Sequence, residues 1–214
     1  MATPLHPARG SQPLLSDGVV WLSPWHDGDD VALGDFNVDP AHARWFDQPP
    51  LDRDRERRRV RHADVIRRWH DEWASGASLT FALRLAKDGI AIGEADLRPR
   101  PPVAANIAYA VTPDHRGRGY APRAARLLAE AGLTRFGFHR IELVCDVDNA
   151  ASRRVAEKAG FVAEGVRRGS GWFENVPEFA GVPRDEAVYA LIRSDFNVHA
   201  DPGTPRWRRL GSVG

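Results

Sequence analysis

A strand pattern, a glycine loop and an amphipathic helix follow one another between residues 105 and 136. In 105–111 larger side chains alternate with the small residues Asn106, Ala108 and Ala110, which predicts a strand with one uncrowded face. Pro113 ends the strand, and Gly117 and Gly119 precede a helix with an apolar stripe. Because the chain turns tightly from strand to helix, the backbone N–H groups of the first helical turn converge on one spot.

This loop has the chemistry of an anion site. The first N–H groups of a helix have no partner within it, and the helix dipole favours negative charge there. Gly117 and Gly119 leave the backbone open to a phosphate, and Arg116, Arg118 and Arg123 add positive charge. The alternative interpretation is a tight turn with solvent-facing arginines. The loop lacks the Gly-Lys-Ser/Thr of a P-loop and the glycine spacing of a dinucleotide fingerprint.

The rest of the chain predicts a mixed α/β domain without regular alternation. We expect further strands at 19–22, 79–85, 90–97, 140–147, 161–166 and 186–192, and helices at 29–36, 41–46, 60–73, 120–136 and 149–159. Residues 1–16 are rich in Pro, Gly and Ser, which predicts a flexible leader before a domain at 17–196. Residues 197–214 are expected to form a C-terminal tail.

Composition argues against several classes of protein. Thirty Lys and Arg against 29 Asp and Glu give a formal charge of +1, so no general attraction to nucleic acid or membrane is expected. The single cysteine, Cys145, excludes an internal disulfide, and no apolar run has the length of a membrane span. The eight histidines lack metal-ligand spacing, so we expect no metal. The N-terminal residues lack the apolar core of a secretory signal, and a cytoplasmic location is the expectation.

Three stretches, at 107–121, 140–143 and 149–161, resemble the GNAT acetyltransferases. The first is similar to their acyl-CoA motif, Arg/Gln-x-x-Gly-x-Gly/Ala. Asn-x-x-Ser from Asn149 and Glu-Gly-Val-Arg at 164–167 are similar to the branch that acetylates ribosomal-protein N-termini, which also holds small-molecule and antibiotic acetyltransferases. The resemblance is strong over 105–193 and weaker but compatible over 18–98. It implies a central, mostly antiparallel sheet with splayed central strands, flanked by helices.

The resemblance also implies that acetyl-CoA is the co-substrate. Its pyrophosphate would bind the loop made by Arg116, Gly117, Arg118, Gly119, Tyr120 and Ala121. Its pantetheine arm would lie between the splayed strands, bonded by the backbone of Ala110, Val111 and Thr112. The same strand also fits an ordinary core strand. Asn149 is interpreted in two ways, as the N-cap of its own helix and as a residue facing pantetheine.

Ser152 is implied as the acid that protonates the departing CoA thiolate, and an exposed serine in a first helical turn is the alternative. Many relatives instead use a tyrosine later in this helix, where this chain has Ala156. A thiol with a pKa near ~8.5 leaves readily as thiolate, so positioning matters more than the acid.

The general base must accept a proton from the attacking amine. Relatives often carry a glutamate on the strand before the loop, where this chain has Asn106. Glu94 and Asp96 continue the row of Ile90 and Ile92, so we expect them to face a cleft and predict Glu94 as the base. Asp146 and Glu174 are alternatives, and any of these carboxylates also fits a solvated or substrate-binding role.

The expected acceptor is a primary amine, on a protein N-terminus or a small molecule. Asp96 and Glu174 suit a cationic acceptor, while Trp172 and Phe173 in the loop 169–184 predict an acceptor wall or, alternatively, a homodimer contact. The predicted reaction is direct attack in a ternary complex. A non-catalytic acyl-CoA-binding or regulatory domain, and a transferase that uses a larger acyl-CoA such as succinyl-CoA, are the other functions that fit.

Overall fold

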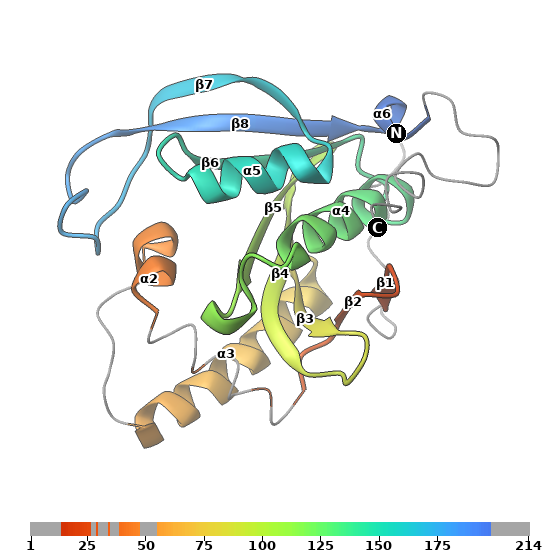
Figure 1. Ribbon diagram of the computed structural model, residues 1–214, viewed down its shortest axis with the longest axis vertical. Helices are drawn as coiled ribbons and strands as arrows, with labels where there is room; N and C mark the ends of the chain where they lie inside the picture. Colours follow the sequence, from red (N-terminus) through yellow and green to blue (C-terminus); the bar gives the residue numbers. More distant parts are fainter. Residues whose placement is uncertain (1–13, 27–28, 30–33, 35–38, 48–54, 198–214) are drawn as a thin grey trace.

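A computed structural model describes residues 14–26, 29, 34, 39–47 and 55–197 (Figure 1). Eight strands form one sheet in the order β1-β2-β3-β4-β5-β6-β8-β7. The strands are β1 (Leu15–Ser16), β2 (Val20–Ser23), β3 (Leu79–Leu85), β4 (Ala91–Arg100), β5 (Ala104–Val111), β6 (Arg140–Asp146), β7 (Val162–Gly171) and β8 (Arg184–Ile192). The helices are α2 (Pro40–Phe46), α3 (Arg55–Ser75), α4 (Tyr120–Thr134), α5 (Ala150–Ala159) and α6 (Arg193–Asn197), with a 3₁₀ turn at Pro113–His115.

The predicted order of strands and helices is confirmed, with shifts at the ends of elements. Leu15 and Ser16, which we had assigned to the leader, pair with Leu22 and Trp21 as β1. Strand β7 runs to Gly171, beyond the predicted end at residue 166. The helix expected at 29–36 falls almost entirely outside the described residues, as do residues 1–13 and the tail from 198 onward. No helix within the described ranges is long and apolar enough to cross a membrane.

Helices cover both faces of the sheet (Figure 1). On one face α4 packs closely, because Gly132 leaves space for side chains from Leu97 of β4 and Ile141 of β6. A Cβ on Gly132 would come within 2.5 Å of Ile141. On the other face Ile66 of α3 packs in a cluster with Ala82 of β3 and Ala110 of β5. The sheet therefore has an α4/α5 face and an α2/α3 face.

Strand β4 contains a bulge that changes which side chains share a face. Leu83 pairs with Gly93 but Arg84 pairs with Ala91, so Ile92 is an extra residue. Ile92 lies fully buried in the larger core on the α4/α5 face. Glu94 and Asp96 point the other way, so the expected row of Ile90, Ile92, Glu94 and Asp96 is wrong.

The two halves of the sheet part between β5 and β6. These strands form the sheet's parallel pair, and their register covers just 104–106 against 140–142. Beyond that point β5 stays paired with β4 up to Val111, and β6 stays paired with β8 up to Asp146. Each strand follows its antiparallel partner, and a gap opens between them. The predicted mostly antiparallel sheet with splayed central strands is confirmed.

Candidate active site

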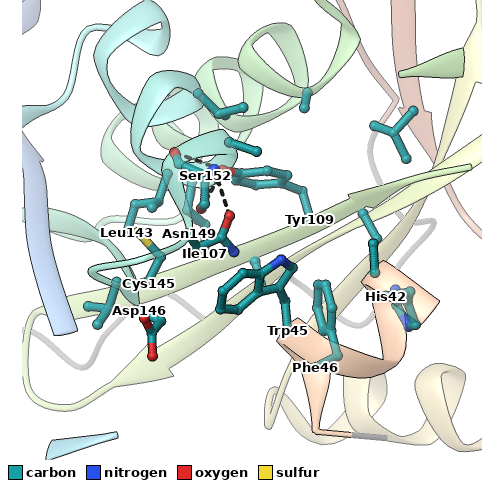
Figure 2. Close-up of a pocket in the computed structure, with 18 of the residues that line it drawn as sticks. His42, Trp45, Phe46, Ile107, Tyr109, Leu143, Cys145, Asp146, Asn149 and Ser152 are labelled. Atoms are coloured by element: carbon teal, nitrogen blue, oxygen red, sulfur yellow. Dashed lines mark hydrogen bonds between the residues drawn. The ribbon is translucent and has the colours of Figure 1, made fainter. Parts of the chain in front are cut away.

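A cleft of about 690 Å³ passes through this gap and is bordered from both faces of the sheet. It is lined by residues of β5 and β6, by the glycine loop, by α5 on one face, and by α2 and the start of the β7–β8 loop on the other. Figure 2 shows the α2 side chains opposite those of α5, with β5 between them. The cleft thus joins two separate binding surfaces through the parted strands.

At one end of the cleft, the glycine loop leads into an uncapped helix. Gly117 and Gly119 have φ values of 75° and 80°, a left-handed conformation that favours glycine. Gly119 is the N-cap of α4 and supplies no side-chain hydrogen bond to the first turn. Gly119, Tyr120 and Ala121 border the cleft, so this helix N-terminus faces it.

The arginines of the loop do not converge as expected. Arg116 forms an ion pair with Asp39, and its Nε donates to the Val111 carbonyl over 2.9 Å. Arg123 donates to Asp17 over 2.7 Å. Arg118 is exposed and does not border the cleft. Arg116 alone of these three arginines borders the cleft, and its charge is already paired with Asp39, so the loop offers an anion mainly its backbone.

Two cations that we did not predict border the cleft from α5. Arg154 and Lys158 lie four residues apart, on one side of the helix. Within the described part of the chain neither forms an ion pair, and the i, i+4 spacing was the available sequence signal.

The backbone of β5 presents alternate N–H groups to the gap. The Thr112 N–H donates to Ile92 O on β4 over 2.9 Å, so it is directed away from the gap. Because N–H directions alternate along a strand, the Ala110 N–H also points toward β4, and those of Val111 and Tyr109 point toward the parted β6. Of the three backbone groups expected to bind pantetheine, only Val111 therefore offers its N–H there.

On the α4/α5 face, Tyr109, Ser152 and Cys145 meet at the cleft. The Tyr109 Oη and Ser152 Oγ lie 2.9 Å apart. Burial raises the pKa of the Tyr109 phenol and also that of the neighbouring Cys145 thiol. Asn149 Oδ1 accepts the Ser152 N–H over 3.0 Å, which confirms its N-cap role and fixes the start of α5 (Figure 2). Tyr109 was missed as a site residue, although it is the one hydroxyl in the row of Ile107 and Val111.

Glu94 and Asp96 lie on the α2/α3 face, beside the β5 residues Ala110 and Ala108. Glu94 is partly buried, opposite Ala82 on one side and Ala110 on the other. Burial raises the pKa of Glu94 to about 7, and the charge of Asp96 adds to the shift. Asp96 is buried, bonded to Arg98 over 2.6 Å and to the Ala108 N–H over 3.1 Å, and its pKa is also raised by burial. Neither carboxylate borders the cleft, although Ala110 and Arg98 do.

The α2 side of the cleft is aromatic. His42, Trp45 and Phe46 border it from α2, and Trp172 and Phe173 border it from the loop after β7. Trp172 is 57% exposed. The side chain of Glu174 is exposed and does not border the cleft, and its backbone N–H bonds to Asp47 instead.

Comparison with known proteins places the whole arrangement. The family model described as an acetyltransferase (GNAT) domain matches residues 20–162. The chain belongs to the GNAT acetyltransferase family. This GNAT chain is 29% identical over 96 residues to the uncharacterized N-acetyltransferase YnaD of Bacillus subtilis, a match that covers 42% of the chain and 50% of YnaD. It spans about half the length of the curated relatives that it matches.

Solved structures show the same GNAT fold. RimJ from Mycobacterium smegmatis, in complex with CoA-disulfide, superposes with a TM-score of 0.66 at 24% identity, covering 86% of this chain and 87% of RimJ. The ribosomal-protein-S5-alanine acetyltransferase from Vibrio fischeri gives a TM-score of 0.64 at 18% identity, covering 86% and 98%. The predicted family is confirmed by the family model, and the structures that share its fold include a ribosomal-protein acetyltransferase. No group of three His, Cys, Asp or Glu among the described residues is arranged to hold a metal.

Proposed function

We propose that this GNAT domain binds acetyl-CoA between β5 and β6 and transfers the acetyl group to a primary amine. The observation that carries the proposal is the gap between the two parallel strands, which opens beside the uncapped N-terminus of α4. The gap offers Val111 N–H to an amide or a thioester, and the helix end offers free N–H groups to a pyrophosphate. The CoA-disulfide held by RimJ, a protein of the same fold, supports this choice of donor.

Each part of the donor has a surface with matching chemistry. The pyrophosphate is assigned to Gly117, Gly119 and the first turn of α4, and the pantetheine arm to the gap. Arg154 and Lys158 on α5 are assigned to the 3′-phosphate of the CoA ribose. Asn149, already the N-cap of α5, borders the same stretch of cleft.

The two faces of the sheet divide the reaction. Attack from the α2 face forms the C–N bond, and the Tyr109 N–H, which also points into the gap, is placed to stabilise the oxyanion of the tetrahedral intermediate. The C–S bond then breaks on the α5 face, where the thiolate takes one proton from the hydrogen-bonded pair of Ser152 and Tyr109 hydroxyls, and the pair regains a proton from solvent. Holding both reactants in one cleft supplies much of the rate.

Glu94 is the proposed base, because it stands on the acceptor side of the sheet. Its pKa of about 7 means that a large fraction of the carboxylate is ionised at neutral pH and able to take a proton. Since Glu94 lies beside Ala110 on the neighbouring strand and does not border the cleft, the proton passes to it through water. Asp96, already bonded to Arg98, is assigned to holding that arginine instead of the acceptor.

A larger acyl donor is the second candidate, because Arg98 borders the cleft and is 57% exposed in its side chain. A guanidinium there would suit the carboxylate of succinyl-CoA. Both candidates are tested by one experiment, in which the protein is incubated with acetyl-CoA or succinyl-CoA and a panel of amines while thiol release is followed. Acetylation of at least one amine is expected, with succinyl-CoA slower. Tight CoA binding without turnover would contradict the proposal and indicate a binding domain.

A further inference from the structure

The α2 wall of the cleft is mainly aromatic. Figure 2 shows Trp45 and Phe46 directed from α2 toward β5, with His42 on the same helix. The rings of His42 and Phe46 are stacked with centroids 4.4 Å apart. Burial lowers the pKa of His42 to about 4, so the ring is neutral at physiological pH. With Trp172 on the opposite loop, the wall favours an aromatic body over a highly charged one.

The carboxylates on the cleft already have bonding partners. The bordering acids are Asp47, Asp146 and Glu186. Asp146 is held by Arg184 at 2.8 and 3.0 Å, and Asp47 accepts backbone N–H groups of the β7–β8 loop. Glu186 accepts from the Ser170 hydroxyl over 2.6 Å and pairs with Arg167 over 3.6 Å. Because each carboxylate is already engaged, the cleft does not offer the row of unoccupied carboxylates that a polyamine requires.

Contacts between α2 and the β7–β8 loop hold the aromatic wall in place. Asp47 accepts N–H groups from Glu174 and Asn175 at 2.7–3.1 Å. Arg44 pairs with Glu178 over 2.6 Å and lies above the rings of Trp45 and Phe179. These bonds fix the helix against the loop, so the wall offers a preformed surface to an acceptor.

A polar atom is available for the amine. Asn106 Oδ1 is buried and has no hydrogen-bond partner within the described part of the chain. Asn106 borders the cleft on the same sheet face as Ala108 and Ala110, where the small side chains leave room. A buried acceptor without a partner costs about 1–3 kcal/mol. Rotation of the Asn106 amide about χ2 would turn Oδ1 into the cleft, where an N–H group of a bound ligand would recover that cost.

We propose that the acceptor is a small monoamine carrying one aromatic ring. The ring lies in the slot made by Trp45, Phe46 and Trp172, and the amine donates an N–H to Asn106 Oδ1. This orientation leaves the nitrogen lone pair free to attack the thioester. The inference rests on the proposed acetyl transfer and specifies its acceptor.

The test compares phenethylamine and tryptamine with hexylamine, spermidine and a short peptide with a free N-terminus. With acetyl-CoA, kcat/KM for the aromatic amines is expected to exceed that for each other acceptor by at least tenfold. Trp45→Leu should bring the ratio of kcat/KM for aromatic amines to kcat/KM for hexylamine close to one, without changing the KM for acetyl-CoA. Trp45→Phe should keep most of the preference for aromatic amines. Asn106→Leu should raise the KM of every amine. Trp21→Leu, which removes a tryptophan outside the cleft, is the matched control.

Calorimetry separates this inference from the proposed function. Phenethylamine is titrated into the protein saturated with CoA, so that binding is measured without turnover. If phenethylamine binds, if Trp45→Leu abolishes that binding, and if the protein acetylates no amine, the aromatic slot is supported and the proposed transferase function is contradicted. A preference for spermidine, hexylamine or the peptide, or a lack of phenethylamine binding, would overturn the slot.

Discussion

The Tyr109 hydroxyl on β5 and the Ser152 hydroxyl on α5 lie 2.9 Å apart, on the sheet face opposite α2. Both residues border the cleft, and the Cys145 thiol lies beside them. Burial raises the pKa of the phenol, so Tyr109 stays protonated at neutral pH and has a proton to share. The pair is therefore the proton source that we propose for the departing thiolate.

Removing either hydroxyl is expected to lower kcat by about ten- to a hundredfold. Because the hydroxyls act as one unit, Tyr109→Phe/Ser152→Ala should be little slower than the worse single variant. The loss should shrink above pH ~8.5, where the thiolate no longer needs a proton. A double-mutant cycle on kcat measures this. Tyr189→Phe, which removes a buried hydroxyl bonded to Arg153, is the control, and additive losses would argue against a shared role.

The local features of the donor site followed from sequence, since they depend on neighbouring residues. The glycine turn before α4 and the Asn149 cap were each readable within a few positions. Partners distant in the chain were not: Arg116 pairs with Asp39, 77 residues away, and Arg123 with Asp17, 106 residues away. Asp39 and Asp17 thus pair with the two arginines that we had expected to bind the pyrophosphate.

The bulge in β4 was hidden for a different reason. Ile90 and Ile92 alternate as in a regular strand, and nothing in that pattern reveals that Ile92 is an extra residue. Gly93 was the available hint, because a Cβ there would lie 2.2 Å from the Ala110 carbonyl oxygen. The bulge places Glu94 on the acceptor face, which is the face that a base requires. Glu94 was thus predicted as the base on a mistaken row.

Glu94→Gln should remove the ascending limb near pH 7 from the kcat profile and lower kcat at pH 8 by about a hundredfold. Measuring the profile with two amines of different pKa shows which group causes the limb. A limb caused by ionisation of the amine shifts with the pKa of the amine, and a limb caused by Glu94 does not. Glu157→Gln, on an exposed part of α5, is the control. A limb that persists in Glu94→Gln would exclude Glu94 as the base.

The same substitution should change stability with pH. The pKa of Glu94 is raised in the folded state from 4.5 to about 7, so the native protein binds the proton more tightly than the unfolded chain. That stabilisation is fully present below pH 4.5 and is lost as the pH rises through 7. The free energy of unfolding of Glu94→Gln, relative to that of the wild-type protein, should therefore rise by on the order of 3 kcal/mol between pH 4.5 and pH 8. Urea unfolding at both pH values measures the difference, and a pH-independent difference would contradict it.

Gly119→Ala separates backbone strain from ligand contact. Gly119 has φ 80° and Gly18 has φ 86°, and a Cβ on either would meet nothing within 4 Å. Alanine at either position should therefore cost a similar ~1 kcal/mol of stability. Gly119→Ala should in addition weaken CoA binding at least tenfold, because the new methyl group stands at the N-terminus of α4. Calorimetric titration of both variants with CoA decides, and equal affinities would place the pyrophosphate elsewhere.

Arg154 and Lys158 provide the sharpest test of how CoA lies in the cleft. Both border it from α5, and neither has an ion-pair partner among the residues that the structure describes. If they hold the 3′-phosphate of CoA, Arg154→Ala and Lys158→Ala should each weaken CoA binding by about tenfold and leave the affinity for 3′-dephospho-CoA unchanged. Arg168→Ala, which removes an exposed cation of β7 away from the cleft, should affect neither ligand. In the wild-type protein the difference in affinity between CoA and 3′-dephospho-CoA should also fall as the salt concentration rises from 0.05 to 0.5 M, since salt screens an exposed charge pair. Equal losses of affinity for both ligands would mean that α5 contacts the pyrophosphate. CoA would then not lie with its pyrophosphate at Gly119, as the loop before α4 predicts.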